Sequence, residues 1–203
     1  MRFIRIAALA AGSLAALAGV AIAEDAAAPQ DRAPQLLAPG LEMSVEVGGA
    51  PMYPSKTIVE NAVNSKDHTI LAAALKAADL VDTLQGAGPF TVFAPVNKAF
   101  EKLPKGMLDN LLKPENKAAL TGVLSYHVVP GKYSVADFVA AVKKAGGKAV
   151  FTTIEGEDLT VEQNGRKLEV IDARGGKAIV TIPDVNQKNG VIHVVDSVLS
   201  PKI

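Results

Sequence analysis

The chain has no cysteine among its 203 residues. This absence excludes disulfides and the Cys-x-x-Cys pairs of many structural zinc sites. Without such cross-links, a domain must be held together by its apolar core, which requires enough chain to build one. About 150 residues remain after the two N-terminal segments described below, a common length for one domain. We therefore expect a single domain that is stabilised by packing alone.

An excess of either charge is missing too, since 21 Lys and Arg residues balance 21 Asp and Glu residues. Proteins that bind nucleic acid usually present a cluster of basic side chains. A phosphate-binding glycine loop is not seen either, because Gly86-x-Gly88 precedes a predicted strand instead of following one. These absences argue against nucleic acid as a partner.

The first 23 residues have the composition of a secretory signal peptide. Arg2 and Arg5 precede an Ala- and Leu-rich run, and small residues end the segment at Ala21-Ile22-Ala23. The apolar run, about 15 residues, is shorter than the roughly 20 that span a bilayer. We predict cleavage before Glu24, which leaves no transmembrane segment and, because two basic residues are removed, a formal charge of −2.

Residues 24–54 are dense in Pro, Ala and Gly and show no sustained period. Such a composition is typical of a flexible linker, although short pieces such as Leu41–Val47 have enough apolar character to dock on a domain. No later segment of similar length repeats. The predicted organisation is a signal peptide over 1–23, a linker over 24–54 and one domain over 55–203.

The first half of this domain has helical patterns. Thr57 and Glu60 form a predicted capping box, in which each side chain bonds a backbone amide of the first turn. One apolar stripe predicts a helix over Asp67–Ala78, and Ser134 begins a later helix. Between them, Ser125–Val129 has strand character and leads into a Pro-Gly turn.

The second half changes to the two-residue period of β-strands. Asn-Gly and Gly-Gly pairs separate the runs and suit the positive φ angles of tight hairpins. The predicted strands are 149–154, 159–163, 167–171, 178–182 and 191–199. Helices followed by an antiparallel meander predict an α+β fold.

One strand of the first half is apolar on both faces. Phe90, Val92 and Ala94 point to one side of the chain and Phe93 to the other. Pro95 lacks the amide that a sheet ladder needs, so the strand ends there and a helix begins directly afterwards. We therefore predict a strand that is covered on both sides.

Three motifs, taken in order along the chain, resemble the fasciclin (FAS1) domain family. They are GPFTVFAPVNKAF at 88–100, YHVVPG at 126–131 and NGVIHVVDSVL at 189–199. The resemblance covers residues 55–203 and is greatest to the small single-domain secreted bacterial members. It implies a FAS1-like wedge, an antiparallel β-sandwich of about seven strands with helices packed along one edge. It also implies that the first and last motifs lie side by side as central strands.

One position departs from the resembled pattern, because Val96 stands where the family usually carries Thr or Ser. A hydroxyl there would cap the following helix, and its loss costs about 1 kcal/mol unless Asn97 caps the helix one residue later. The sequence leaves the geometry of this corner open.

The three histidines are the candidates for metal binding or catalysis. A zinc site needs three or four converging ligands, often including a close pair, and His68, His127 and His193 form no such pair. His68 precedes a helix and is expected to be solvated. His193 lies in a strand that looks buried, where its nitrogens must find internal partners. We predict no metal and no cofactor.

Asp196-Ser197 close to His193 invites comparison with a hydrolase. A serine nucleophile needs a base within hydrogen-bond reach. In an extended strand, however, His193 and Ser197 are roughly 13 Å apart. No Gly-x-Ser-x-Gly elbow occurs in the sequence either. We predict no catalytic residue, and we expect Asp196 to bond backbone amides at the end of the terminal strand.

The Tyr126-His127 pair is the candidate partner-binding site. In animal members of the resembled family, a Tyr-His pair flanked by branched apolar residues is implicated in cell adhesion. Branched apolar residues also flank the pair here, at 123–124 and 128–129. Two interpretations stay open, because these flanks also suit, and favour, a pair that is interior and ties a loop to the sheet.

Together these observations favour an exported, non-enzymatic binding or adhesion module, periplasmic or extracellular, that contacts surface proteins, glycans or matrix. The polar loops 155–158, 164–166 and 184–189 are further contact points. The alternative is a periplasmic carrier of a small hydrophobic ligand, which an apolar cavity between helices and sheet would favour. A hydrolase is the third class, and it would require His127 or His193 to be exposed beside a hydroxyl or carboxylate.

Overall fold

Two neighbouring strands with apolar side chains on both faces organise the fold. In the computed structural model, which describes residues 43–202, β3 (Phe90–Pro95) runs parallel to β9 (Gly190–Val195). The strands approach closely, and a Cβ at Gly190 would overlap the carbonyl oxygen of Phe90. Nearly every residue of both strands is buried. The prediction of a strand covered on both sides is therefore confirmed, as is the central position of the first and last motifs.

Seven strands form one continuous sheet, in the order β4-β3-β9-β8-β7-β6-β5. The α+β class and the number of strands are as expected. The sheet is mixed, however, because β3 and β9 pair in parallel, which the long stretch of chain between them makes possible. The other strands are β4 Val128–Pro130, β5 Lys148–Thr152, β6 Asp158–Asn164, β7 Lys167–Ile171 and β8 Lys177–Gln187.

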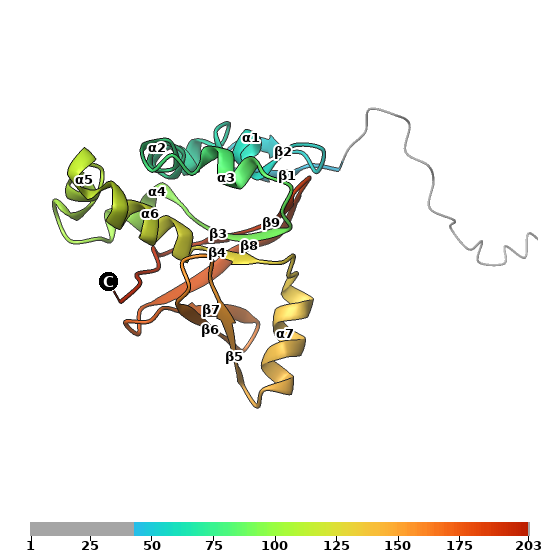
Figure 1. The fold of residues 1–203 in the computed structure, drawn as a ribbon. Helices are drawn as coiled ribbons and strands as arrows, with labels where there is room; N and C mark the ends of the chain where they lie inside the picture. The colour runs from blue at the N-terminus through green and yellow to red at the C-terminus, as the bar shows by residue number, and fades with distance from the viewer. Residues whose placement is uncertain (1–42, 203) are drawn as a thin grey trace, which may run out of the picture. The chain divides into compact units, whose positions relative to one another are not determined.

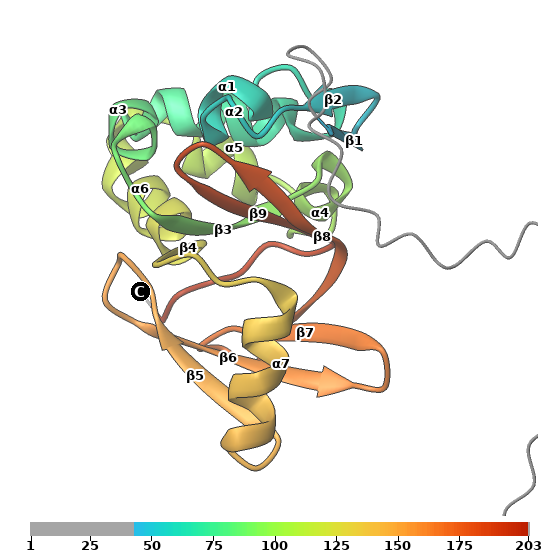
Figure 2. The same ribbon diagram turned by 90° about the vertical axis from the view of Figure 1, so that its right-hand side faces the viewer.

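Strand β8 bends the sheet into two layers. Its register with β9 shifts twice, between Val180 and Ile182 and again between Ile182 and Val185. Figure 1 shows β4, β3 and β9 above this bend and β5, β6 and β7 below it. The helix α7 (Val135–Lys144) packs against β5 and β6 at the side of the lower layer (Figure 2). These two layers form the sandwich that the family resemblance implies.

Six helices lie over the β3–β9 layer, on the side away from the lower strands (Figure 1). Their side chains pack with Val92, Ala94, Ile192 and Val194 into what we call the first core. The helices are α1 Ile58–Ala62, α2 Thr69–Ala77, α3 Val81–Gln85, α4 Asn97–Glu101, α5 Met107–Leu111 and α6 Lys117–Tyr126.

The second core lies between the two layers of the sheet. Phe93 and Val195 point into it from β3 and β9, on the face opposite to their neighbours in the first core. Phe138 closes it from α7. The lower layer contributes Leu159, Val161, Leu168 and Val170, and the start of β8 contributes Ala178. The β3–β9 pair is thus shared by both cores.

Two predicted helix starts are confirmed by their caps. Thr57 and Glu60 form a capping box at the start of α1, and Ser134 and Asp137 form another at the start of α7. In both, the hydroxyl accepts from the amide three residues on while the carboxylate accepts from the cap amide.

A hairpin that precedes the helices corrects the predicted end of the linker. Strand β1 (Val45–Val47) pairs with β2 (Ala50–Met52), and Val47 and Met52 are buried in the first core. Gly48 turns the chain at φ 60°, where a Cβ would lie 2.5 Å from the Ser65 hydroxyl oxygen. The linker was expected to extend to residue 54, but residues 45–52 are ordered because two apolar side chains dock on the helices.

The predicted signal peptide over 1–23 and the linker up to residue 42 lie outside the described residues. Within residues 43–202, no helix is long and apolar enough to cross a membrane.

The corner after β3 has no side-chain cap, which is the first of the two possibilities that the sequence left open. Val96 occupies the N-cap of α4, and its side chain makes no capping hydrogen bond. Asn97 does not replace it: its Oδ1 accepts from the amide of Ile70 at 3.1 Å, and its Nδ2 donates to the carbonyl oxygen of Lys66 at 2.9 Å. Asn97 therefore provides no substitute cap, because its side chain bonds the first turn of α2 and the turn before it instead of its own helix.

Candidate functional site

Tyr126 and His127 lie at the junction between α6 and β4. Tyr126 is the last residue of the helix and His127 is its C-cap, so the predicted strand character begins only at Val128. Both side chains are buried, with exposed fractions of 0% and 2%.

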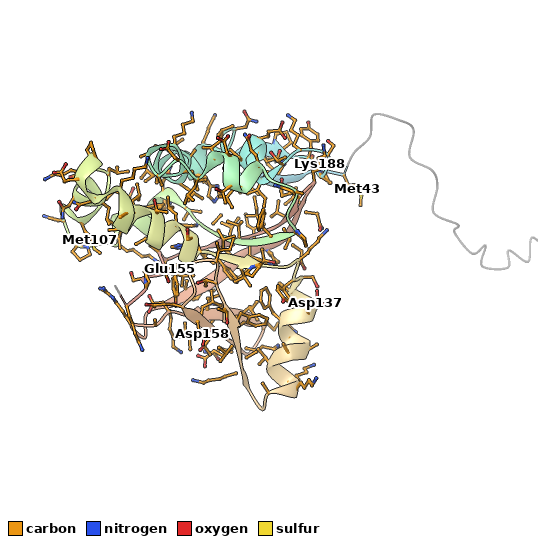
Figure 3. All side chains as sticks on the ribbon, in the orientation of Figure 1. Met43, Met107, Asp137, Glu155, Asp158 and Lys188 are labelled. Atoms are coloured by element: carbon orange, nitrogen blue, oxygen red, sulfur yellow. The ribbon has the colours of Figure 1, made fainter. Side chains whose placement is uncertain are left out.

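The Tyr126 hydroxyl joins two turns of the lower layer. It donates to the carbonyl oxygen of Asp158 at 2.8 Å and accepts from the amide of Ala173 at 2.9 Å. Asp158 begins β6 (Figure 3), and Ala173 follows β7. Burial raises the pKa of Tyr126 to about 12. The hydroxyl therefore stays protonated and serves as a fixed cross-link.

Both nitrogens of His127 are used inside the domain. Nδ1 lies 2.7 Å from the carbonyl oxygen of Val123, and Nε2 lies 3.0 Å from the amide nitrogen of Leu199. A carbonyl only accepts and an amide only donates, so the proton is on Nδ1 and the ring is neutral. Burial lowers the pKa of His127 to about 4, which keeps it neutral near pH 7.

These contacts argue against the predicted direct role of Tyr126 and His127 in partner binding. A partner that approaches the folded domain meets neither side chain, and their polar atoms already have partners. The geometry instead supports the second interpretation, in which the pair is interior and positions surface segments. The segments that it holds are the β7–β8 turn at Ala173 and the C-terminal segment at Leu199.

The other two histidines are buried as well. His193 was expected to be a satisfied core residue, and this is confirmed: Nε2 lies 2.8 Å from the carbonyl oxygen of Tyr133, and Nδ1 accepts from the amide of Asp184 at 3.3 Å. His68 was expected to be solvated, which is wrong. It is 1% exposed and its Nδ1 is bonded to the Ser65 hydroxyl at 2.9 Å. Burial lowers the pKa of both imidazoles.

The hydrolase interpretation finds no support at Ser197. Its hydroxyl lies 3.1 Å from a carboxylate oxygen of Asp196 and 3.3 Å from Lys102 Nζ, while both nitrogens of His193 are occupied elsewhere. Asp196 accepts from the amide of Ile179 at 2.8 Å, so its predicted bond to the backbone is confirmed. Among residues 43–202, no three His, Cys, Asp or Glu side chains converge as metal ligands would.

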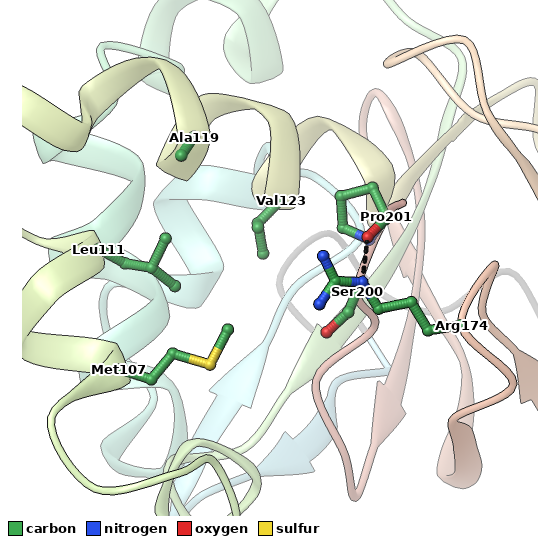
Figure 4. Close-up of a pocket in the computed structure, with 7 residues that line it drawn as sticks. All are labelled: Met107, Leu111, Ala119, Val123, Arg174, Ser200 and Pro201. Atoms are coloured by element: carbon green, nitrogen blue, oxygen red, sulfur yellow. Dashed lines mark hydrogen bonds between the residues drawn. The ribbon is translucent and has the colours of Figure 1, made fainter. Parts of the chain in front are cut away.

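A surface pocket adjoins the buried pair. Its volume is about 110 Å³, and it lies between α5, α6, the β7–β8 turn and the C-terminal segment (Figure 4). We call it the α5–α6 pocket. The residues that line it are Met107, Leu111, Ala119, Val123, Arg174, Ser200 and Pro201.

Buried and partly buried hydrogen bonds hold the C-terminal wall of this pocket in place. The amide of Leu199 donates to His127, and the amide of Ser200 donates to a carboxylate oxygen of Asp172 at 3.0 Å. Arg174 Nε donates to the carbonyl oxygen of Pro201 at 2.8 Å. The internal role of His127 is therefore to fix one wall of the α5–α6 pocket.

Sequence reasoning missed this pocket. The apolar spacing of Met107 and Leu111 indicates a helix but not what it faces, and Arg174 lies in an ordinary turn next to Gly175-Gly176. No local pattern connects the two, because the pocket forms only when segments far apart in sequence meet.

The space between helices and sheet is nearly filled. The gap there, which is lined by apolar side chains and His127, measures about 20 Å³. Pockets that hold a drug-sized ligand measure about 300–1,000 Å³. This gap therefore offers no room for the ligand of the predicted carrier.

Comparisons with known proteins agree with the motifs. The family model described as "Fasciclin domain" matches residues 66–201. "Protein sll1483" of Synechocystis is 44% identical over 160 residues, which cover 79% of this chain and 82% of that protein. "Immunogenic protein MPB70" of Mycobacterium bovis is 35% identical, with 95% of this chain and 96% of that protein covered.

A solved structure shares the fold. It is a FAS1 domain pair from the insect cell adhesion molecule Fasciclin I, and it matches with a TM-score of 0.63 at 19% identity. The match covers 80% of this chain and 58% of that one. At this identity the similarity supports the arrangement of helices and strands and nothing further.

Proposed function

The chain belongs to the fasciclin domain family, and from this premise we propose that it is an exported, non-enzymatic module that mediates cell-surface or matrix interaction. Its partners are surface proteins, glycans or matrix, and its location is periplasmic or extracellular. Membership of the family supports this assignment, because another protein with FAS1 domains, Fasciclin I, is a cell adhesion molecule.

The observation that carries the proposal is the burial of all three imidazoles and of Tyr126. Catalysis needs a titratable or nucleophilic group that substrate can reach, and these groups are enclosed and bonded to the backbone or to a neighbouring side chain. A domain built in this way acts through the surface that its core supports. Binding by exposed loops and pockets is the function that such a surface performs.

A periplasmic carrier of a small hydrophobic ligand was the alternative. It depended on a roomy apolar cavity between helices and sheet, where the gap measures only about 20 Å³. Close packing at this place favours the binding module over the carrier.

Attachment assays test the proposed function. Cells that lack the gene should adhere less to matrix-coated surfaces and form less biofilm than wild-type cells, and the gene supplied on a plasmid should restore both. The purified mature protein should bind the same surfaces directly. Unchanged attachment of the deletion strain, together with no binding by the purified protein, would refute the proposal.

A further inference from the structure

The chain contains the dipeptide Asn-Gly twice, at Asn164-Gly165 and at Asn189-Gly190. This dipeptide can deamidate spontaneously, because glycine has no side chain to hinder its own amide nitrogen. The nitrogen attacks the side-chain carbon Cγ of the asparagine, a C–N bond forms, and Nδ2 leaves as ammonia with the amide proton. Water then opens the succinimide ring to give aspartate or isoaspartate. The structure places the two copies in very different surroundings.

Asn189-Gly190 is enclosed at the start of β9, where Asn189 is 6% exposed. The side chain of Asn189 is held at both ends: Nδ2 donates to the carbonyl oxygen of Leu84 at 2.7 Å, and Oδ1 accepts from the amide of Ile58 at 3.1 Å. Its main-chain carbonyl accepts from the amide of Phe90 at 3.0 Å. Ring closure would require these bonds to break, so it needs local unfolding first.

Asn164-Gly165 lies in the exposed turn between β6 and β7, at the outer end of the lower layer (Figure 2). Gly165 has a φ of 62°, and a Cβ there would meet nothing within 4 Å. Within residues 43–202, the amide nitrogen of Gly165 makes no hydrogen bond. The attacking atom is therefore available, and water reaches the turn.

The side chain of Asn164 makes one hydrogen bond among the described residues. Its Nδ2 donates to Oε1 of Glu169 at 3.0 Å, so the bond is on the nitrogen that leaves and not on the carbon that is attacked. Nothing comparable to the enclosure of Asn189 holds this side chain in place.

We propose that Asn164 is a site of spontaneous deamidation, and that the carboxylate formed there loosens the end of the β6–β7 hairpin. Asn189, with the same neighbour in sequence, stays intact in the folded protein. The reaction consumes water and releases ammonia, and it needs no oxidant or reductant. This inference is independent of the proposed function, because it concerns the covalent structure of the chain.

The contact with Glu169 makes the conversion unfavourable for the fold. The side chain of Glu169 is 9% exposed, and its Oε2 lies 3.1 Å from Lys177 Nζ. After deamidation, a carboxylate that has no hydrogen to donate takes the place of Nδ2 beside Oε1. Two carboxylates at this distance repel each other, and water screens a half-enclosed pair poorly. The contact between residue 164 and Glu169 is therefore lost.

Isoaspartate disturbs the backbone as well. Its main chain runs through the side-chain carbon, which adds a further carbon atom at the end of β6. Asn164 pairs with Lys167 next to the turn, and the register of a hairpin is fixed by the length of its loop. We expect this end to fray while the inner pair Val161 and Val170, which is buried in the second core, stays in place.

Peptide mapping of the full mature protein tests the site. Trypsin cleaves after Lys and Arg, so it releases Asn164 in peptide 149–166 and Asn189 in peptide 189–202, each without a second asparagine. After incubation at pH 8 and 37 °C, mass spectrometry and isoaspartate-specific labelling should find conversion in the first peptide and not in the second. In guanidinium chloride, where the fold is lost, both should convert at similar rates.

Two outcomes would overturn the assignment of the site. One is an Asn164 that stays intact in the folded protein while it converts in guanidinium chloride. The other is equal conversion of Asn164 and Asn189 in the folded protein. Asn164→Gln should abolish conversion in peptide 149–166, because Gln would have to close a larger ring. Asn186→Gln, at another exposed asparagine, is the control and should leave that conversion unchanged.

Asn164→Asp reproduces one product and tests the loosening. Hydrogen exchange at the amide of Lys167 should become about threefold faster, or more, than in wild type. Adding Glu169→Gln should restore slow exchange, because Gln carries no charge and can donate to the new carboxylate. Unchanged exchange in Asn164→Asp and in incubated wild-type protein would refute the loosening. Fast exchange that Glu169→Gln does not reverse would refute repulsion as its cause.

Discussion

Tyr126 and His127 are two adjacent residues that connect segments far apart in the chain. Tyr126 bonds Asp158 and Ala173, and His127 bonds Leu199. When a buried polar side chain is removed, its former partners stay in the interior without a hydrogen bond. In the unfolded chain the same groups bond to water, so their loss of a partner destabilises the folded state. We therefore expect substitution of either residue to lower the free energy of unfolding.

Tyr126→Phe is expected to lower the free energy of unfolding by about 2–3 kcal/mol, because the amide of Ala173 and the carbonyl of Asp158 lose their shared partner while the ring remains. Urea unfolding followed by circular dichroism measures this change. Tyr53→Phe, which removes the hydroxyl of a half-exposed tyrosine, is the control and should change stability by less than about 0.5 kcal/mol. An equal effect of both substitutions would show that the Tyr126 cross-link is unimportant.

His127 should make the domain sensitive to acid. Its pKa is about 4 in the folded state and about 6.5 in an unfolded chain, so the unfolded state binds the proton more readily. The stability that the neutral His127 contributes is fully present above pH 6.5. It is lost as the pH falls toward 4, and the free energy of unfolding then decreases by about 3 kcal/mol in total. His68 and His193, with lowered pKa values, act in the same direction.

Urea unfolding at pH 6.5 and pH 5 checks this prediction. The loss of stability between these two values should be smaller by about 2 kcal/mol in His127→Gln than in the wild-type protein, because Gln does not titrate. Equal losses in the two proteins would mean that His127 is not the titrating group.

At the scale of single elements, the ends of the helices show how local rules and tertiary contacts compete. The helices α1 and α7 begin with complete capping boxes. The N-cap of α4, Val96, has no polar side-chain atom and makes no cap, and Asn97 bonds Lys66 and Ile70 of the neighbouring turn instead.

Val96→Thr should increase the free energy of unfolding by about 0.5–1 kcal/mol. The hydroxyl would accept from an amide of the first turn of α4, and Thr keeps nearly the shape of Val at this half-buried position. Val96→Ala, which adds no cap and removes apolar contacts, should instead lower it. If Val96→Thr lowered the free energy of unfolding as much as Val96→Ala, a side-chain cap would not stabilise the first turn of α4.

At the scale of the whole molecule, one strand pair serves two cores. Helices cover one face of β3 and β9, while the lower strands and α7 cover the other. The hairpin β1–β2 extends the first core, so the stable unit begins before residue 55.

A chain that begins at residue 55 is therefore expected to be less stable than one that begins at residue 43. Removal of Val47 and Met52 from the first core costs about 1.5–3 kcal/mol for each side chain, or about 3–6 kcal/mol together. Thermal and urea unfolding of both chains would measure the difference. Identical transitions would mean that the hairpin contributes nothing to the domain.

The amino-acid sequence by itself determined the features that depend on neighbours along the chain. The alternation in Phe90–Ala94 predicts burial on both faces, and Ser134 with Asp137 predicts a helix start, because side-chain direction and capping are set within a few residues. The three motifs likewise identified the family from their order alone.

Tertiary structure alone decided the features that arise where distant segments meet. The parallel pairing of β3 with β9, the burial of His68 and the attachment of Asn97 to α2 each depend on a partner that no local pattern names. The α5–α6 pocket is of the same kind, since Met107 and Arg174 approach it from different parts of the chain. Interactions between near neighbours follow from the order of residues, whereas a surface pocket forms only after distant segments have folded together.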